Sequence, residues 1–449
     1  DLHSFPTRRS SDLWQRDTAT VLTPNSIGGD WGQGIFPFKD RLGRSRVAVT
    51  LYEGGADTIK ILKPESVSWE DPVQTISGQD HSLSNIRKMV SLGDYLYGIS
   101  YGNNPYGGQP SDIAQVRRFK FNMSNDIYVA DGNASFTYTP AAAQGHGEGL
   151  AAYGSNIFAI LTMTTGSYPN FDYGQNKLVK LGADLEVVLS VDMVGRNTDG
   201  GTPGAYCQDG NLLYITSWGG NQPVGPDIAP YRVETLVESV DLSSSNLTHA
   251  NCVRGSWMKS RDVNWNHYFT GIAVANGNAY VQASRWNDSK AEGLSSSRAK
   301  KSAAASGLRS GGEVRLYVVS ADQLGLLSGD HKVQTISFND GWRLGLNLDE
   351  NYLYVAAGSN LYRYTLPVTA DSVATVFGPD GTSLGGDISA FASVPSLRGV
   401  SAAQAAMDGL VQAKAAREEK GDGRGCDAGL LWGWLLLLAA VPVALRRRG

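Results

Sequence analysis

The sequence has little cysteine, little histidine and little net charge. Three cysteines in 449 residues are too few for a disulfide scaffold of the kind that holds small secreted domains together. Charged residues make up 18% of the chain and the formal net charge is −4, which argues against the basic surface of a nucleic-acid binder. Six histidines are a thin supply for acid–base catalysis. We therefore expect no nucleic-acid partner, and we favour a non-enzymatic protein over an enzyme.

Familiar motifs of cofactor and metal chemistry are also missing. The sequence has no nucleophile elbow, phosphate-binding loop, zinc-ligand spacing or dinucleotide fingerprint. Asp199, in the loop 197–204, lacks the further carboxylates of a calcium-binding pattern, so we interpret it as a turn residue. No cofactor and no metal are expected.

A turn followed by an alternating strand recurs along the chain. Each turn contains Gly, Asp or Asn, and the strand is entered through an aromatic residue. The copies lie at 93–97, 154–158, 210–214, 277–280 and 349–354, with a degenerate first copy at 43–52. Their aromatic residues are 61, 56, 66 and 74 residues apart: Tyr97, Phe158, Tyr214, Tyr280 and Tyr354. Such turn residues suit tight hairpins, and β-branched and aromatic residues suit half-buried strands.

Every copy is followed, after a loop, by another alternating strand. These strands are expected at 58–62, 116–121, 177–181, 237–242, 314–319 and 361–366. The repeat unit is thus strand, hairpin, strand, loop and strand, with room for a fourth, and no sustained helical period interrupts it. This predicts an all-β fold, a β-propeller of about six blades, with seven possible, over residues 14–395. Residues 387–394 are a candidate for the strand that closes the ring, and a β-helix or sandwich is the alternative. The pattern resembles the irregular β-propellers of bacterial envelopes.

The C-terminal tail differs from everything before it. Residues 428–445 form an uncharged run of 18 residues, which as a helix would span about 27 Å, close to the thickness of a bilayer core. Trp432 and Trp434 lie near one end of the run, and three arginines, 446–448, follow the other. We expect a transmembrane helix, preceded by a helical and Gly-rich stalk at 396–425, with the propeller outside the cytoplasmic membrane.

A Gly-Cys pair, Gly425-Cys426, precedes this apolar run and its basic end. Over about the last 25 residues the layout resembles the bacterial C-terminal sorting domains of the Synerg-CTERM type, with myxobacterial-type and GlyGly-type tails as neighbours. The resemblance implies sorting to the cell surface, with Cys426 as the cleavage or modification point and a sorting protease as a partner. A plain single-pass anchor is the alternative, and both place the protein at the cell envelope.

The first 13 residues, DLHSFPTRRSSDL, lack an initiating methionine and an apolar segment. They resemble a translated sequencing adapter joined to a truncated gene, and they cannot act as a signal peptide. We expect that a native signal peptide preceded the sequence at residue 14.

Three similar loops follow the second strand of their repeats, at 101–108, 166–173 and 218–223, and a fourth aromatic stands at the matching place in the next repeat. Their rings are Tyr106, Tyr168, Trp218 and Trp286. Equivalent positions in a propeller open onto one face, where rings and amides together could bind a cell-wall glycan or a protein. The alternative is that these residues only build well-packed loops.

His146 is the leading titratable candidate, because it stands next to Glu148 in a glycine-rich stretch, 144–149, and could bind a ligand or act as a base. A single loop histidine is more often structural. Cys207 and Cys252 could form a disulfide in an oxidising envelope, or remain two buried thiols.

These features predict an envelope-anchored propeller that presents a ligand- or partner-binding face. The alternative is an exported propeller enzyme, a lyase or hydrolase, with its site in the central channel. An enzyme would need several charged residues at strand starts facing the axis.

Overall fold

The computed structural model describes residues 31–53, 56–63, 72–78, 81, 83, 85–102, 114–138, 144–165, 172–200, 202–219, 235–247, 268–285, 313–321, 334–338, 344–349, 351–357 and 360–377. The chain divides into two units, Asp1–Val394 and Pro395–Gly449, and every described residue belongs to the first.

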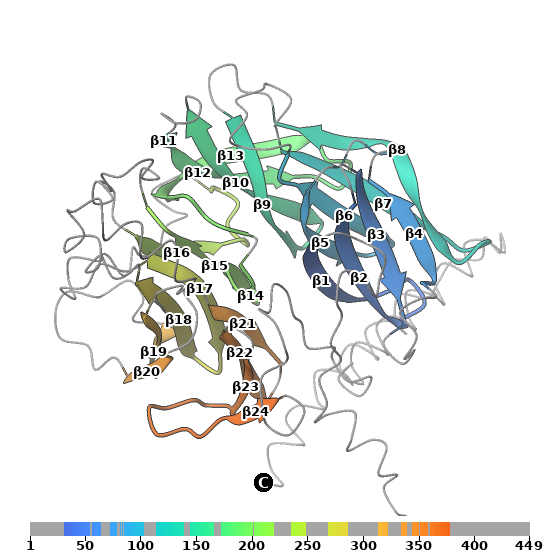
Figure 1. Cartoon of the computed structure of the whole chain (residues 1–449). Helices are drawn as coiled ribbons and strands as arrows, with labels where there is room; N and C mark the ends of the chain where they lie inside the picture. Colours follow the sequence, from blue (N-terminus) through green and yellow to red (C-terminus); the bar gives the residue numbers. More distant parts are fainter. Residues whose placement is uncertain are drawn as a thin grey trace, which may run out of the picture. The chain divides into compact units, whose positions relative to one another are not determined.

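Six antiparallel sheets make up the described part of this unit, and they follow one another along the chain as the blades of a propeller (Figure 1). Blade 1 contains β1(Trp31–Lys39), β2(Ser45–Glu53), β3(Ala56–Leu62) and β4(Gln74–Ser77). Blade 2 contains β5(Ile86–Leu92), β6(Tyr95–Ser100), β7(Gln115–Asn122) and β8(Ile127–Thr137). Blade 3 contains β9(Gln144–Tyr153), β10(Asn156–Thr165), β11(Asp172–Tyr173), β12(Gln175–Leu181) and β13(Val187–Arg196).

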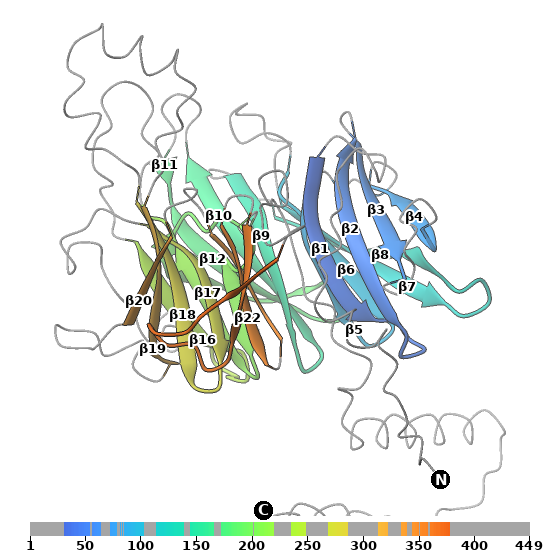
Figure 2. The ribbon, with the colours of Figure 1, turned by 60° about the horizontal axis from the view of Figure 1, so that its bottom comes forward.

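The second half of the propeller repeats this plan. Blade 4 contains β14(Tyr206–Asp209), β15(Leu212–Ser217) and β16(Leu236–Asp241). Blade 5 contains β17(Tyr268–Ala275), β18(Asn278–Arg285), β19(Glu313–Ser320) and β20(Gln334–Phe338). Blade 6 contains β21(Leu344–Leu348), β22(Tyr352–Ala357), β23(Asn360–Thr365) and β24(Thr375–Phe377). Figure 2 shows the strands of each sheet side by side, as twisted blades.

The repeated turn and strand pattern explains this architecture. The turn glycines Gly93, Gly154, Gly210 and Gly277 all adopt positive φ, between 58° and 75°, and each connects the first two strands of a blade. The aromatic residues that define the repeat lie on the second strand, where Tyr97, Phe158 and Tyr280 are fully buried. The prediction of a six-bladed propeller is therefore confirmed, and the third strand of every blade also falls where the alternating pattern predicts it.

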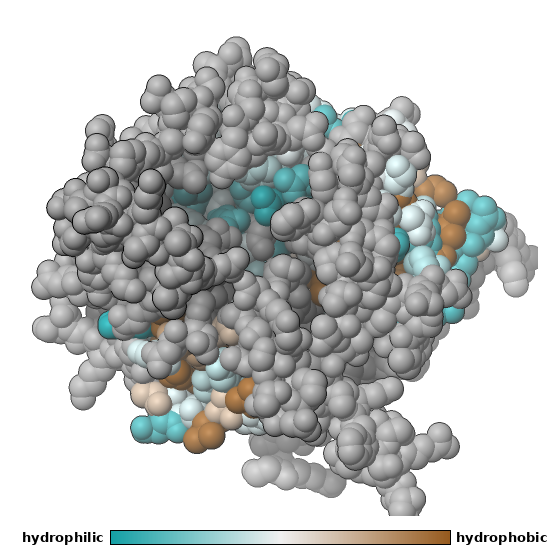
Figure 3. Space-filling model, in the orientation of Figure 1, coloured by the Kyte–Doolittle hydropathy of each residue, from teal (hydrophilic) through white to brown (hydrophobic). Residues whose placement is uncertain are grey.

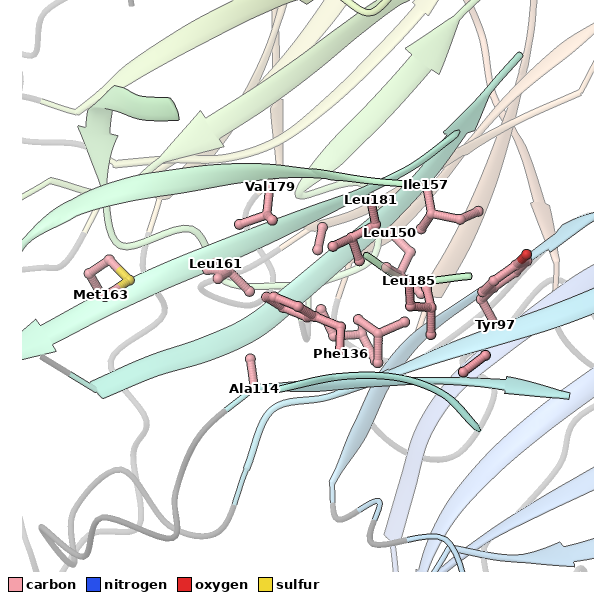
Figure 4. Close-up of a cluster of buried hydrophobic side chains, with 14 residues drawn as sticks. Tyr97, Ala114, Phe136, Leu150, Ile157, Leu161, Met163, Val179, Leu181 and Leu185 are labelled. Carbon is pink, nitrogen blue, oxygen red and sulfur yellow. The ribbon is translucent and has the colours of Figure 1, made fainter. Parts of the chain in front are cut away.

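Apolar side chains fill the space between neighbouring blades. In the cluster of Figure 4, blades 2 and 3 contribute residues from both facing sheets. Phe136 of β8 packs there with Leu161 of β10 and Val179 of β12. Burying a side chain of this size contributes roughly 1.5–3 kcal/mol to stability, so such contacts between blades hold the ring together.

Blades 3 and 4 share an apolar cluster as well, and a buried polar network also joins them. Asn176 is fully buried, and its amide donates to Thr198 Oγ1 at 2.9 Å and to Ser217 Oγ at 3.1 Å. Glu238 is also fully buried, and its carboxylate accepts hydrogen bonds from the backbone N–H groups of Val194 at 2.6 Å and Gly195 at 2.8 Å. Buried polar groups are stable only when they are hydrogen-bonded, and these bonds fix one arrangement of the two blades.

The two ends of the propeller are distinguished by the strand order. At the hairpin end lie the turns that join the first strand of a blade to the second, and the third to the fourth. At the mouth end the innermost strands, β1, β5, β9, β14, β17 and β21, begin and the second strands end. The connection from the second strand to the third therefore starts and finishes at the mouth end in every blade.

Some predictions fall outside the described residues. These are the closing strand at 387–394, the stalk at 396–425 and the transmembrane helix at 428–445. Within the described part of the chain, no helix has the length and apolar character needed to cross a membrane.

Candidate functional site at the mouth of the axis

The innermost strands share a β-bulge near the mouth end. The pairing register skips one residue in β5, in β9 and in β17, and the extra residues are Arg87, Glu148 and Thr270. Each of them stands six residues before the first residue of its hairpin turn. A bulge re-aims a side chain away from the regular pleat, and bulges are frequent beside functional sites. In blades 2, 3 and 5 the repeat thus places one irregular residue at the same end of the ring.

A segment at 197–205 runs from blade 3 toward the axis; within it, residue 201 is not described. We call it the axial segment. The carbonyl of Gly204 accepts a hydrogen bond from Ile272 N in blade 5 at 2.6 Å, and that of Pro203 accepts one from Leu346 N in blade 6 at 2.9 Å. Gly200 N donates to Glu148 Oε2 at 2.7 Å. The axial segment therefore joins three blades and carries Asp199 to the mouth residues.

Glycines allow these backbones to approach closely. A Cβ atom on Gly147 would lie 2.3 Å from the carbonyl oxygen of Ser100, and one on Gly200 would lie 1.7 Å from that of Glu148. The alternation of glycine with His146 and Glu148 in β9 is thus a packing requirement.

Arg87, Tyr101 and His146 form a stack at the mouth end. The Arg87 guanidinium lies 4.5 Å from the centre of the Tyr101 ring, and the His146 ring is stacked on that ring at 4.7 Å and 22°. His146 Nδ1 is 3.3 Å from the carbonyl oxygen of Tyr101 and Nε2 is 3.1 Å from Thr164 Oγ1. Because a carbonyl can only accept, Nδ1 carries the proton and Nε2 accepts from the threonine hydroxyl.

His146 is fully buried, and this burial is the main cause that lowers its pKa to about 4; the backbone bond to Tyr101 opposes the shift and the charge of Arg87 adds to it. The ring is therefore neutral at pH 7, and both nitrogens have partners. These contacts favour a positioning role for His146, which supports Tyr101 and through it Arg87.

Glu148 is the more reactive group. It is 3% exposed, and burial raises the pKa of its carboxyl to about 8. The negative charge of Asp199 raises the pKa further. The positive charges of Arg87 and Lys88 and the hydrogen bond from Gly200 N lower it, but they do not cancel the effect of burial. The carboxyl group thus retains a proton at neutral pH and can donate it.

Lys88 follows the bulge of β5 and reaches across the axis. Its Nζ lies 5.9 Å from the centre of the Phe36 ring in blade 1 and 5.8 Å from that of the Tyr206 ring in blade 4. Tyr206 is held by two hydrogen bonds of 2.9 Å between its hydroxyl and the backbone of Leu150. The lysine is thus enclosed by rings from two other blades.

The space-filling view shows a hollow in the face of Figure 1, with hydrophilic residues inside it (Figure 3). Chemically, the mouth end combines two cationic side chains, one protonated carboxyl group and a second acid, Asp199. Such a set can bind polar groups and transfer a proton. Among the described residues, no group of three His, Cys, Asp or Glu side chains is placed to hold a metal ion.

The structure describes only some of the site residues that the sequence predicted. Trp218 directly follows β15 and is 9% exposed, so most of its ring is covered, which favours packing over presentation to a ligand. Tyr106, Tyr168 and Trp286 lie outside the described residues. The loops that contain them start at the mouth end, because each follows the second strand of its blade.

Cys207 has a free thiol, and burial raises its pKa to about 12. Its predicted partner, Cys252, and the predicted processing residue, Cys426, lie outside the described part of the chain. The disulfide and the processing point therefore stay predictions.

Sequence reasoning missed Arg87, Lys88 and Glu148 as site residues. A usable signal was present, because the position six residues before the hairpin turn holds a charged residue in three blades, Arg87, Glu148 and Arg343, whereas blade 5 has Thr270 and blade 4 has Gly204 there. The bulge itself is not visible in the alternation pattern.

No known protein family matches the sequence, and no curated protein matches it. Solved structures with a similar fold include an uncharacterized protein, lmo1340, from Listeria monocytogenes EGD-e, with 9% identity over 81% of this chain and 87% of that chain and a TM-score of 0.33. The Dos1 propeller is 9% identical over 77% and 69%, with a TM-score of 0.39. The polysaccharide lyase Uly1 is 11% identical over 82% and 88%, with a TM-score of 0.42. Similarity at this level does not reveal what the present chain binds or catalyses.

Proposed function

We propose that the chain is an extracytoplasmic β-propeller, held at the cell envelope by its C-terminal tail, that binds a polar ligand at the mouth of its axis. The observation that carries this proposal is the gathering of Arg87, Lys88, Glu148 and Asp199 on the innermost strands and the axial segment. Charged groups are costly to desolvate, and the apolar clusters between the blades do not require them there.

The aromatic loops support the same site. Tyr106, Tyr168 and Trp286 follow the second strands of blades 2, 3 and 5 in the sequence, and those strands end at the mouth end, so we propose that these residues contribute to the same site. Flat rings together with charged groups suit an envelope glycan that carries hydroxyl or acidic groups.

Binding can be tested with the full chain and an isolated cell-wall fraction. Arg87→Ala removes one cation from the mouth end and should weaken cosedimentation with the cell-wall fraction by about tenfold, the scale of one lost charged hydrogen bond. Lys177→Ala is the matched control, because Lys177 pairs with Asp192 on the outer strands β12 and β13. Equal retention of both variants would contradict a site at the mouth end.

Anchoring can be tested separately. Deletion of residues 427–449 removes the apolar run and the arginine cluster, so it should release the protein from the membrane fraction into the medium or periplasm. Unchanged membrane association would contradict the anchor and leave the axial site unaffected.

A second function, an exported lyase or hydrolase, is favoured by one observation. Glu148 is a carboxyl group whose pKa is raised to about 8, close to Asp199, an arrangement that suits a general acid beside a second carboxylate. If the protein is such an enzyme, Glu148→Gln should abolish turnover of a glycan while retaining binding. Turnover that survives the substitution would exclude this mechanism.

A further inference from the structure

Lys88 differs from two other lysines of the propeller, Lys39 and Lys177. Lys39 Nζ donates to Ser45 Oγ at 2.6 Å, and Lys177 forms an ion pair with Asp192. Lys88, by contrast, has the two rings of Phe36 and Tyr206 as its close contacts, and no hydrogen bond or ion pair joins it to any residue that the structure describes. An amine that is desolvated and lacks a fixed acceptor loses the interactions that normally hold its proton.

The surroundings of Lys88 also lower the pKa of its amine. Burial lowers the pKa of its amine to about 8, and the neighbouring charge of Arg87 lowers it further, while Asp199 and Glu148 raise it. Three other titratable neighbours, Tyr206, Tyr101 and His146, carry no charge at pH 7. Burial raises the pKa of the two tyrosine hydroxyls and lowers that of the histidine ring. Lysines that are desolvated and stand next to another cation are the ones that act as nucleophiles in proteins.

We propose that Lys88 is a nucleophilic amine that condenses with the carbonyl group of an aldehyde or ketone ligand, with Glu148 as the proton donor. The geometry that supports this is the position of Nζ near the rings of Phe36 in blade 1 and Tyr206 in blade 4; the carboxyl group of Glu148, which Gly200 N holds, interacts electrostatically with this amine. The inference goes beyond the proposed binding function and holds for any ligand that exposes a carbonyl at the mouth end.

The reaction balances without any further reactant. The lone pair of neutral Nζ forms a bond to the carbonyl carbon, and one N–H proton moves to the carbonyl oxygen. The C–O bond then breaks, and the oxygen leaves as water with a second proton, which comes from the Glu148 carboxyl group. The products are a protonated imine on Lys88, a Glu148 carboxylate and one water molecule.

Reductive trapping tests this directly. The full chain is incubated at pH 7 with glyceraldehyde and cyanoborohydride, and the labelled lysines are identified by peptide mass spectrometry. Lys180 is the internal control, because its Nζ also lies 5.8 Å from the centre of a ring, that of Phe158, but on the outer strand β12. Lys88 should be labelled on the order of tenfold faster than Lys180, because burial lowers the pKa of the Lys88 amine and so raises the neutral fraction of that amine at this pH.

Two variants complete the test. Lys88→Arg keeps the charge and should remove the label, whereas Glu148→Gln should slow labelling of Lys88 several-fold and leave that of Lys180 unchanged. Labelling of Lys88 no faster than that of Lys180 would overturn the proposal. Unchanged labelling of Lys88 in Glu148→Gln would overturn the role of Glu148. Neither labelling result depends on whether the protein cosediments with the cell-wall fraction, so this test is separate from that of the proposed binding function.

Discussion

At the hairpin end of the propeller the charged groups are paired, whereas at the mouth end they are held among rings and backbone amides. Arg44 binds Asp40 of its own turn and Asp126 of blade 2, and Arg118 binds Asp131 of blade 2 and Asp184 of blade 3. Lys88 contacts two rings instead, and Glu148 accepts a backbone hydrogen bond.

The pKa shifts at the two ends have opposite consequences. The hydrogen bond to Asp126 raises the pKa of Arg44 and lowers that of Asp126, so both charged forms are favoured. At the mouth end burial lowers the pKa of Lys88 to about 8 and raises that of Glu148 to about 8, so each shift favours the neutral form more than in an ordinary amine or carboxyl group. Paired charges join blades to one another, whereas groups poised near neutral pH are suited to binding and chemistry. We therefore regard the hairpin end as structural and the mouth end as functional.

The largest effect is expected from crowding the backbone at the mouth end. In Gly200→Ala the new methyl group would meet the carbonyl of Glu148 at 1.7 Å, so the axial segment must move. We expect a loss of about 3 kcal/mol in the free energy of unfolding, measured in urea. Gly132→Ala is the control, because nothing lies within 4 Å of the new atom. Similar stability of both variants would contradict the packing of this segment.

A smaller loss of stability is expected when a charged side chain is removed, and the loss should differ between the two ends of the propeller. Arg118 is 8% exposed and its removal leaves Asp131 without its partner, so Arg118→Ala should cost about 2 kcal/mol. Lys88→Met removes a desolvated charge that has no ion pair among the described residues, so its cost should stay below about 1 kcal/mol. Urea denaturation of the two variants gives the comparison, and a larger loss for Lys88→Met would reverse the assignment of the two ends.

A further effect on stability depends on pH. The folded-state pKa of Glu148 is raised from 4.5 to about 8, so the folded protein binds one more proton than the unfolded chain between these values. Stability contributed by the protonated group is therefore present below pH 4.5 and is lost as the pH rises toward 8. Glu148→Gln should be more stable than the wild type by about 2 kcal/mol at pH 8.5 and equal to it near pH 4. Thermal unfolding at the two pH values measures this, and a difference that does not depend on pH would contradict the shift.

Most of the fold could be predicted from the sequence because its signals are local. A positive-φ glycine followed by an alternating strand marks each hairpin, and the buried rings of Tyr97, Phe158 and Tyr280 mark the second strands. These signals depend on neighbouring residues alone, so the irregular lengths of the loops did not obscure them.

The site could be predicted less well because it depends on contacts between blades. The exposure of Trp218 is set by neighbouring segments and not by its loop composition, so the sequence suggested a presented ring where the structure buries one. Glu148 was noted only as a neighbour of His146, because the bulge that makes Glu148 the irregular residue of β9 appears only in the pairing with β10. Arg87 and Glu148 are two charged residues on inner strands, of the several that an enzyme would need there.

Titration of Lys88 tests the difference between the two ends most directly. The lysines of the full chain can be labelled with ¹³C-methyl groups and followed by NMR from pH 6 to pH 11, with Lys88→Arg to assign the signal. The account predicts that the Lys88 signal titrates with a pKa of about 8, because burial and Arg87 disfavour its charged form. Titration near 10.4, the ordinary value for a lysine amine, would show that the mouth end holds its charges as the hairpin end does and would contradict the assignment of the site.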